Sequence, residues 1–249
     1  MILEKNFFNL KVVLVEPNGP LNVGSIARLC ANFEVKELRI VSPQCDIMSL
    51  EARKMALKGL EYLDQCKIFN NIEQAIFDCD LVLASCGRIE NCKDTSFESP
   101  EDIFKWISSF SHINNLAVLF GREDRGLTNS ELLFAQKIFK IPTSDNYPSL
   151  NLSHAVSIIL YELNKSPKRD FNSDLKVFNI ASSRQIKESF TEIEEMLLEV
   201  GYLLKHTSRA KLIKFKKYIL RANTSNHEIN VLRGIVHQIK WFLNNSKSK

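Results

Sequence analysis

Three short polar segments hold the side chains with the greatest capacity for chemistry. They carry Asn22 and Arg28, then Glu123, then Ser149 and Asn151. Amides and hydroxyls orient a polar substrate through hydrogen bonds, and an arginine stabilises negative charge that develops on an oxygen. No G-x-G-x-x-G, no G-x-x-x-x-G-K-[ST] and no Ser/His/Asp set accompanies them. Ordinary dinucleotide enzymes, P-loop nucleotidases and serine hydrolases are therefore disfavoured.

Each of these residues also has a purely structural interpretation. Ser149, Asn151 and Ser153 could be turn and N-cap residues, which such residues usually are. Glu123 could be a surface turn carboxylate. Considered alone, the local sequence favours capping. The secondary-structure elements around the segments are therefore needed to choose between a structural and a functional role.

Buried strands are predicted before each polar segment. The apolar runs at Lys11–Glu16, Leu38–Val41, Asp80–Ala84, Leu116–Phe120 and Lys137–Ile141 show little period-two alternation and are separated by helical stretches. This arrangement predicts an α/β fold with a parallel sheet covered on both faces. The carboxyl ends of parallel strands share one edge, where ligands bind. The polar segments are therefore expected to converge on one site.

The helices between these strands are predicted from their spacing and end signals. Asn22 or Ser25 is expected to cap a helix that carries Ile26, Leu29 and Phe33. The other expected helical segments are Ser49–Leu60, Ile72–Phe77, a helix opened by Pro100, a short helix with a Thr128/Glu131 capping box, and one carrying Ala155, Ile158, Ile159 and Leu163.

The chain changes character after residue 164. Lys165–Ser183 is predicted to be a linker, and helices are predicted over Arg184–His206, Ser208–Arg221 and Asn226–Leu243. The expected organisation is one domain over residues 1–164, a linker over 165–183 and a helical extension over 184–249. From Lys165 onward 17 Lys and Arg stand against 8 Asp and Glu, a net charge of +9, whereas the first 164 residues carry −5. Such an asymmetry suggests a polyanionic partner.

A basic run in the extension is the candidate nucleic-acid surface. The run could be an ordinary solvent-exposed helix face. Alternatively, it could contact the phosphates of a nucleic acid, which would fit a polyanionic partner. Its members are Arg209, Lys211, Lys214, Lys216, Lys217 and Arg221.

Composition disfavours a metal, disulfide or membrane protein. All six cysteines lie within the first 92 residues without a C-x-x-C pair, and no H-E-x-x-H occurs. No apolar run approaches the length of a membrane span. Reduced thiols and a cytoplasmic location are expected.

Three motifs together resemble those of the SPOUT RNA 2′-O-ribose methyltransferases (the TrmH/SpoU type). They are Asn22-x-Gly24-x-x-x-Arg28, the run FGREDRGL over 120–127, and Ile141-Pro142 with SLNLS over 149–153. The resemblance covers about residues 9 to 164. Glu162 and the tail, with Leu220-Arg221-Ala222, Glu228 and LRGI over 232–235, resemble the tRNA branch called TrmJ.

The resemblance implies a C-terminal trefoil knot, which no composition or periodicity could reveal. It implies S-adenosylmethionine as cofactor, held at Ser85, Cys86, Gly87, Phe120, Gly121, Arg122, Ile141, Pro142 and Leu150. It assigns catalytic roles to Asn22, Arg28, Glu123, Ser149 and Asn151. It further implies a homodimer that methylates cytidine or uridine at the first nucleotide of the tRNA anticodon loop.

The family assigns a base role to the arginine that Arg28 matches. A guanidinium is protonated at any working pH, so we expect Arg28 to stabilise the developing alkoxide or fix a phosphate. Two alternatives stay open at this stage. One is methylation of ribosomal RNA, and the other is an RNA-binding protein that has lost catalysis.

Overall fold

The computed structural model describes residues 8–87, 97–108, 110, 113–165, 181–204, 211–212, 215, 218–219, 222 and 224–246. Contacts divide the chain into two compact units, Met1–Val177 and Phe178–Lys249. None of the described helices is both long and apolar enough to cross a membrane.

The first unit is built on a six-stranded parallel sheet. Its strands are β1 (Asn9–Val15), β2 (Glu37–Val41), β3 (Lys67–Phe69), β4 (Leu81–Ser85), β5 (Asn115–Phe120) and β6 (Lys137–Phe139), in the order β3-β2-β1-β5-β4-β6. The sequence predicted all of these strands but β3. That strand has three residues at the sheet edge, and Ile68 is 58% exposed, so it carries no buried apolar run.

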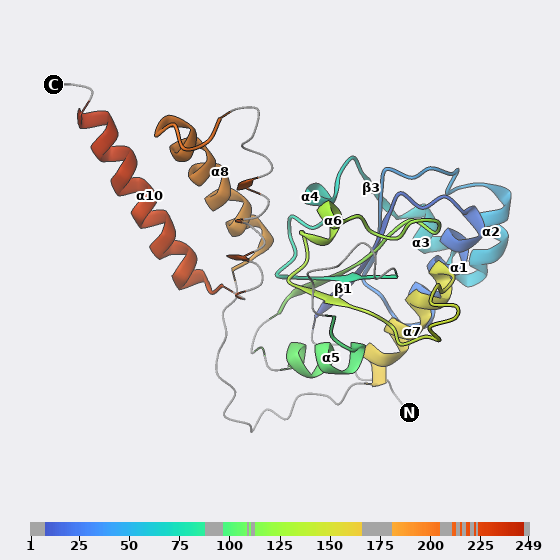
Figure 1. Ribbon diagram of the computed structural model, residues 1–249. Helices are drawn as coiled ribbons and strands as arrows, with labels where there is room; N and C mark the ends of the chain where they lie inside the picture. The colour runs from blue at the N-terminus through green and yellow to red at the C-terminus, as the bar shows by residue number, and fades with distance from the viewer. Residues whose placement is uncertain are drawn as a thin grey trace. The chain divides into compact units, whose positions relative to one another are not determined.

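Helices cover both faces of this sheet, as predicted (Figure 1). On one face α4 (Ile72–Ala75) and α6 (Asn129–Leu132) contribute to a core with alternate residues of the strands. The opposite face is covered by α1 (Pro20–Asn32), α5 (Pro100–Ser108) and α7 (Leu152–Lys165). Further helices follow β2: α2 (Leu50–Ala56), a 3-10 turn (Leu57–Gly59) and α3 (Leu60–Asp64). The Thr128/Glu131 capping box and the helix opened by Pro100 are both confirmed.

Two glycines allow α1 to pack closely against the segment after β2. A Cβ on Gly24 would lie 2.2 Å from the Ala52 carbonyl oxygen, and one on Gly59 would lie 2.5 Å from that of Ala27. Only glycine permits this separation. The glycine of the first motif therefore permits close packing of α1.

The prediction for the start of α1 was wrong. The helix begins at Pro20 with Gly19 as N-cap, not at Asn22 or Ser25. Proline suits the first helical position because its missing N–H would have no partner there. The Asn22 side chain is thereby left available for contacts with other loops.

The second unit contains α8 (Ser183–Glu199) and α10 (Asn226–Ser246), described apart from the first unit. Ile186, Phe190 and Ile229 form one buried cluster, and Ile193, Met196 and Val236 form another. The first cluster joins the beginnings of the two helices and the second joins later residues of both, so the helices run parallel. The helix predicted to reach His206 ends at Glu199, before Gly201 at φ +83°, and Val200 and Leu204 are exposed. The observed architecture confirms the predicted fold class, while the knot stays a prediction.

Candidate functional site

The Glu123 carboxylate is the centre of a hydrogen-bond network at the carboxyl edge of the sheet. It accepts from the backbone N–H groups of Asn18 (2.9 Å) and Gly19 (3.0 Å) and from Nδ2 of Asn22 (2.9 Å). Glu123 lies after β5, whereas Asn18 and Gly19 lie between β1 and α1 and Asn22 lies in the first turn of α1. The structure thus joins the first and second motifs through one side chain, and Glu123 is more than a surface turn residue.

Asn151 adds the third motif to this network. Its Nδ2 donates to Oδ1 of Asn22 over 2.9 Å, between residues 129 positions apart. Its Oδ1 accepts from the backbone N–H of Ser153 (2.8 Å) and of His154 (3.4 Å) at the start of α7. Asn151 is therefore both a helix cap and a bridge between loops. The capping role and the place in a candidate site, which the sequence offered as alternatives, occur together.

A pocket lies beside this network and gathers most of the predicted cofactor residues. Its lining includes Ser85, Cys86, Gly87, Phe120, Gly121, Arg122, Ile141 and Leu150, but not Pro142. Glu123, Ser149 and Lys140 also line it. Its volume is about 90 Å³, so a nucleoside-sized ligand would remain partly exposed.

The pocket walls offer backbone groups. The N–H groups of Ile141, Ser149 and Leu150 donate to no other described residue. A Cβ on Gly87 would meet no protein atom within 4 Å, so backbone is open to approach there. Backbone donors beside apolar side chains suit a heteroaromatic base and a carboxylate. The residues present therefore fit S-adenosylmethionine, and side-chain identity matters little for such contacts.

The 121–126 loop is shaped by glycine. A Cβ on Gly121 would lie 2.2 Å from the backbone of Gly126, and Gly126 has φ +69°. Any other residue at Gly121 would clash, and a side chain at Gly126 would strain the backbone. The two glycines fix the turn that presents Glu123.

Arg125 holds this loop against its neighbours, a role that sequence reasoning missed. Its guanidinium donates to Glu16 (2.7 Å) at the end of β1 and to Glu131 (2.9 and 3.0 Å) in α6. Burial opposes ionisation of Glu131, but the Arg125 guanidinium outweighs it and keeps the pKa of that carboxyl below its usual value. The sequence did offer one indication of this role, because Arg125 follows two acidic residues in GREDRG and is therefore in a segment rich in charges that can pair.

Arg28 lies apart from the network. It is exposed on α1 and makes no ion pair or hydrogen bond with the described residues. Six residues along a helix separate it from Asn22 by about 9 Å of rise and about 120° of rotation. Within one protomer the structure does not bring Arg28 to Glu123 or to the pocket lining.

The predicted RNA-binding residues are mostly outside the described part of the chain. Arg209, Lys214, Lys216, Lys217 and Arg221 all lie there. Lys211 is described and exposed, with its Nζ 4.8 Å from the centre of the Tyr202 ring.

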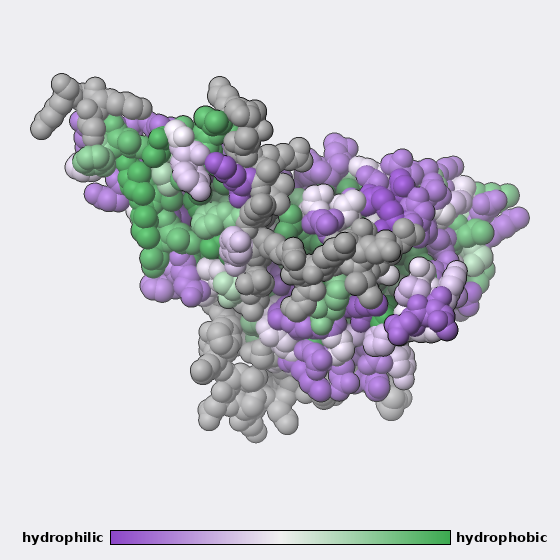
Figure 2. All heavy atoms as spheres, in the orientation of Figure 1, coloured by the Kyte–Doolittle hydropathy of each residue, from purple (hydrophilic) through white to green (hydrophobic). Residues whose placement is uncertain are grey.

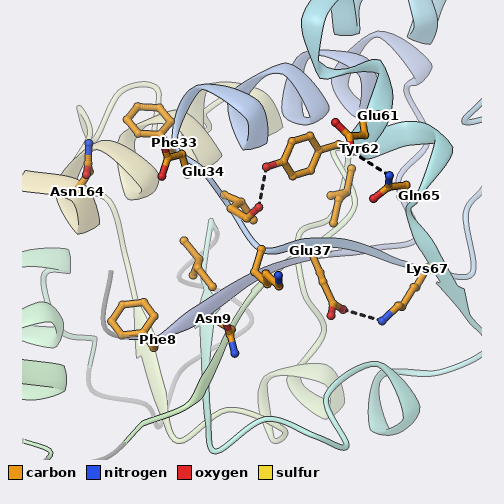
Figure 3. A pocket seen from close by; sticks show the side chains of 14 residues that line it. Phe8, Asn9, Phe33, Glu34, Glu37, Glu61, Tyr62, Gln65, Lys67 and Asn164 are labelled. Carbon is orange, nitrogen blue, oxygen red and sulfur yellow. Dashed lines mark hydrogen bonds and ion pairs between the residues drawn. The ribbon is translucent and has the colours of Figure 1, made fainter. Parts of the chain in front are cut away.

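A larger cavity, of about 650 Å³, lies at the opposite edge of the sheet (Figure 3). Phe8, Asn9 and Glu37, from the beginnings of β1 and β2, are among the residues that line it. Glu37 is ion-paired with Lys67 at 3.3 Å. None of the predicted catalytic or cofactor residues lines this cavity, so size alone does not mark the candidate site.

Comparison with protein families matches both units. Residues 9–161 match the SpoU rRNA Methylase family, and residues 184–248 match the C-terminal domain of the tRNA methyltransferase TrmJ. The tRNA (cytidine-2′-O-)-methyltransferase TrmJ of Methanocaldococcus jannaschii is 36% identical over 88% of this chain and 94% of its own length. The tRNA (cytidine/uridine-2′-O-)-methyltransferase TrmJ of Sodalis glossinidius is 28% identical over 93% and 91%.

Solved structures share the fold. The crystal structure of TrmJ from Z. mobilis ZM4 matches with a TM-score of 0.78 and 24% identity, over 92% of this chain and 98% of that one. The SpoU methyltransferase AviRb from Streptomyces viridochromogenes, crystallised with the cofactor AdoMet, matches with a TM-score of 0.52 and 18% identity, over 65% and 58%.

Proposed function

This chain belongs to the SpoU methylase family, in the TrmJ branch of tRNA methyltransferases, and we propose that it transfers a methyl group from S-adenosylmethionine to a ribose 2′-hydroxyl of tRNA. The target nucleotide is a cytidine or uridine, which we place at the first position of the anticodon loop. The enzyme works in the cytoplasm, where its substrate is found. The Glu123–Asn22–Asn151 network beside the pocket carries the proposal, because it joins all three motifs in one place.

The cofactor supplies an activated methyl group on a sulfonium. The protein must therefore hold the ribose hydroxyl in line with that methyl and stabilise the charge that develops on oxygen. Backbone groups at Ile141 and Leu150 would hold the cofactor, together with Ser85 to Gly87, which also line the pocket. Ser149, at the pocket rim, would contact the target nucleotide.

Asn22 and Asn151 would orient the ribose. Both amides are already held by protein partners, Asn22 by Glu123 and Asn151 by the start of α7. A held amide keeps its remaining hydrogen-bonding capacity in a fixed direction, which lowers the entropy lost when substrate binds. Glu123 then acts through Asn22 as a positioning residue.

The position of Arg28 supports a homodimer. Its guanidinium lies away from the pocket of its own protomer, so a role in the reaction requires the pocket of a second copy. Exposed apolar side chains occur on α1 and α2, among them Leu21 (51%) and Leu50 (68%), as an interface would require. In that arrangement Arg28 would stabilise the developing alkoxide or fix the neighbouring phosphate, and the hydroxyl proton would leave to solvent.

The test is incubation of the purified protein with labelled S-adenosylmethionine and total tRNA. Nuclease digestion and mass spectrometry are expected to locate a ribose methyl group on a cytidine or uridine. Ribosomal RNA is offered in parallel, and methyl transfer to it alone would support the rRNA alternative. Binding of tRNA without any transfer would identify an inactive RNA-binding protein and overturn the proposal.

A further inference from the structure

Tyr147 is the most exposed large apolar or aromatic side chain in the described part of the chain, at 78%. It lies in the loop between β6 and α7, and the other residues of 143–149 are Thr, Ser, Asp, Asn and Pro. Figure 2 shows hydrophobic side chains gathered over α10, whereas the surface beside α7 is mainly hydrophilic. A single aromatic ring in polar surroundings does not form the continuous apolar patch that a protein partner needs.

Hydrogen bonds within the loop fix the backbone that carries this ring. Oγ1 of Thr143 donates to the Pro148 carbonyl over 3.0 Å, and the Tyr147 N–H donates to the Ser144 carbonyl over 3.2 Å. Proline also restricts the residue before it, here Tyr147, to extended conformations. The loop is therefore closed on itself, and less conformational entropy is lost when the ring binds a flat ligand.

The ring lies beside the candidate site. Pro148, Ser149 and Leu150, which follow Tyr147 in the chain, all line the pocket, whereas Tyr147 itself does not. Two residues of extended chain span at most about 7 Å. A ribose held at Ser149 and Asn151, as proposed above, therefore carries a base that is within reach of the Tyr147 ring.

A nucleotide in an RNA loop needs such a ring when it enters an active site. Proteins recognise loop nucleotides by separating the base from its neighbours and stacking it on an aromatic side chain. The new stack replaces part of the stacking energy that the base loses. Phe120 is the only aromatic residue among the described residues of the pocket lining, and it is 1% exposed. Tyr147 therefore supplies the accessible ring.

We propose that Tyr147 stacks on the base of the nucleotide whose ribose is methylated. The inference rests on the proposed methyl transfer to tRNA and adds the residue that holds the base. Every base has a π-face, so stacking accepts cytidine and uridine alike without reading their hydrogen-bonding edges. Tyr147 takes no part in the bond changes at the ribose oxygen, and it acts as a substrate-binding residue.

The test compares the full wild-type chain with Tyr147→Ala and Tyr147→Phe on an unmodified tRNA transcript whose anticodon loop begins with cytidine. Tyr147→Ala is expected to lower kcat/KM for the transcript about tenfold to a hundredfold, the effect of losing one base–aromatic stack. Tyr147→Phe keeps the ring and should stay within about twofold of wild type. Affinity for S-adenosylmethionine, measured by calorimetry without RNA, should be equal in all three because Tyr147 does not line the pocket.

A second transcript, with an abasic ribose at the target position, identifies the base that is stacked. It keeps the 2′-hydroxyl and lacks the stacking surface. Filter binding with the demethylated cofactor gives Kd without turnover. Wild type is expected to lose about as much affinity for the abasic transcript as Tyr147→Ala loses for the intact one, and the two changes together should add little, since they remove the same contact. Asn146→Ala, exposed in the same loop, is the matched control and should bind both transcripts as wild type does.

Three results would overturn the stacking role while the proposed function stands. They are equal losses from Tyr147→Ala on intact and abasic transcripts, a Tyr147→Phe variant as impaired as Tyr147→Ala, and an Asn146→Ala variant as impaired as Tyr147→Ala. The last would attribute the loss to the conformation of the loop. Absence of methyl transfer by the wild-type protein would instead overturn the proposed function, and this inference with it.

Discussion

At the scale of the residue, the Glu123 carboxylate holds loops from three parts of the chain together. Glu123 accepts three hydrogen bonds from the end of the loop after β1 and the first turn of α1, and the Asn22 side chain is in turn hydrogen-bonded to Asn151. A carboxylate suits this position because all three groups that face it are donors. An amide would place an N–H against one of them.

Glu123→Gln is therefore expected to lower the free energy of unfolding by about 1–3 kcal/mol, the usual effect of leaving donors unpaired. S-adenosylmethionine affinity should fall as well, because the loop lines the pocket. Chemical denaturation and isothermal titration calorimetry measure the two effects. Glu51→Gln, on exposed α2, is the control, and an identical response of both variants would contradict the positioning role.

Arg28→Ala is expected to reduce the methyl-transfer rate about a hundredfold to a thousandfold, as loss of a donor to developing charge does. Cofactor affinity should stay unchanged because Arg28 is outside the pocket lining. Arg28→Lys keeps the charge but loses the planar fork and should recover little of the rate. Single-turnover kinetics provides the measurement, with exposed Arg53→Lys as control. Near-full activity of Arg28→Lys would disprove bidentate contact.

At the scale of the element, the sequence predicted what periodicity can encode. Buried strands such as Leu116–Phe120 and the helix from Leu152 were found because their apolar residues recur at fixed intervals. The edge strand Lys67–Phe69 was missed because its residues are exposed. The start of α1 was misjudged because the role of Asn22 depends on Glu123, 101 residues away. Contacts of that range leave no local signal.

The partners in an ion cluster at the amino ends of the strands could not be predicted from the sequence either. Lys11 and Arg39 are each 2% exposed, and both bind Asp78, at 2.6 Å. Hydrogen bonds from Arg39, and then from Lys11, hold the pKa of the Asp78 carboxyl well below its usual value. A lysine and an arginine inside apolar strands gave no indication of their partner in the sequence.

Asp78→Asn is expected to cost about 2 kcal/mol at pH 7, less than the ~3–5 kcal/mol of a fully buried pair, because Asp78 is about half exposed. A carboxyl whose pKa is lowered on folding stabilises the protein above its unfolded pKa, near 4. That contribution is lost as the pH falls below this value. Urea unfolding at pH 7 and near pH 3.5 should show the difference between variant and wild type shrinking.

Asp64→Asn removes a more exposed pair, with Arg53, and serves as the control. Its effect should be within about 1 kcal/mol at either pH. A penalty for Asp78→Asn that stays constant from pH 7 to pH 3.5 would show that charge is not the source of the stabilisation.

At the scale of the whole molecule, charge is distributed unevenly along the chain. The residues from Lys165 onward carry +9, and the first 164 carry −5. The proposed site of methyl transfer lies in the mildly acidic part, so we expect attraction of tRNA to come mainly from the extension. A polyanion bound there releases counterions, and its affinity falls with salt in proportion to the phosphates contacted.

Replacing Lys214, Lys216 and Lys217 together by Gln is therefore expected to weaken tRNA binding and to reduce the slope of log Kd against log salt by about 2. Filter binding over a range of salt concentrations gives the slope. Gln at Lys54, Lys58 and Lys105, all exposed in the first unit, makes the same change in net charge. Equal loss of slope in both triple variants would assign the effect to net charge, and an unchanged slope in the first would remove the basic run from the interface. Loss confined to the first variant, with cofactor affinity retained, would establish that the basic run of the extension contributes directly to tRNA binding.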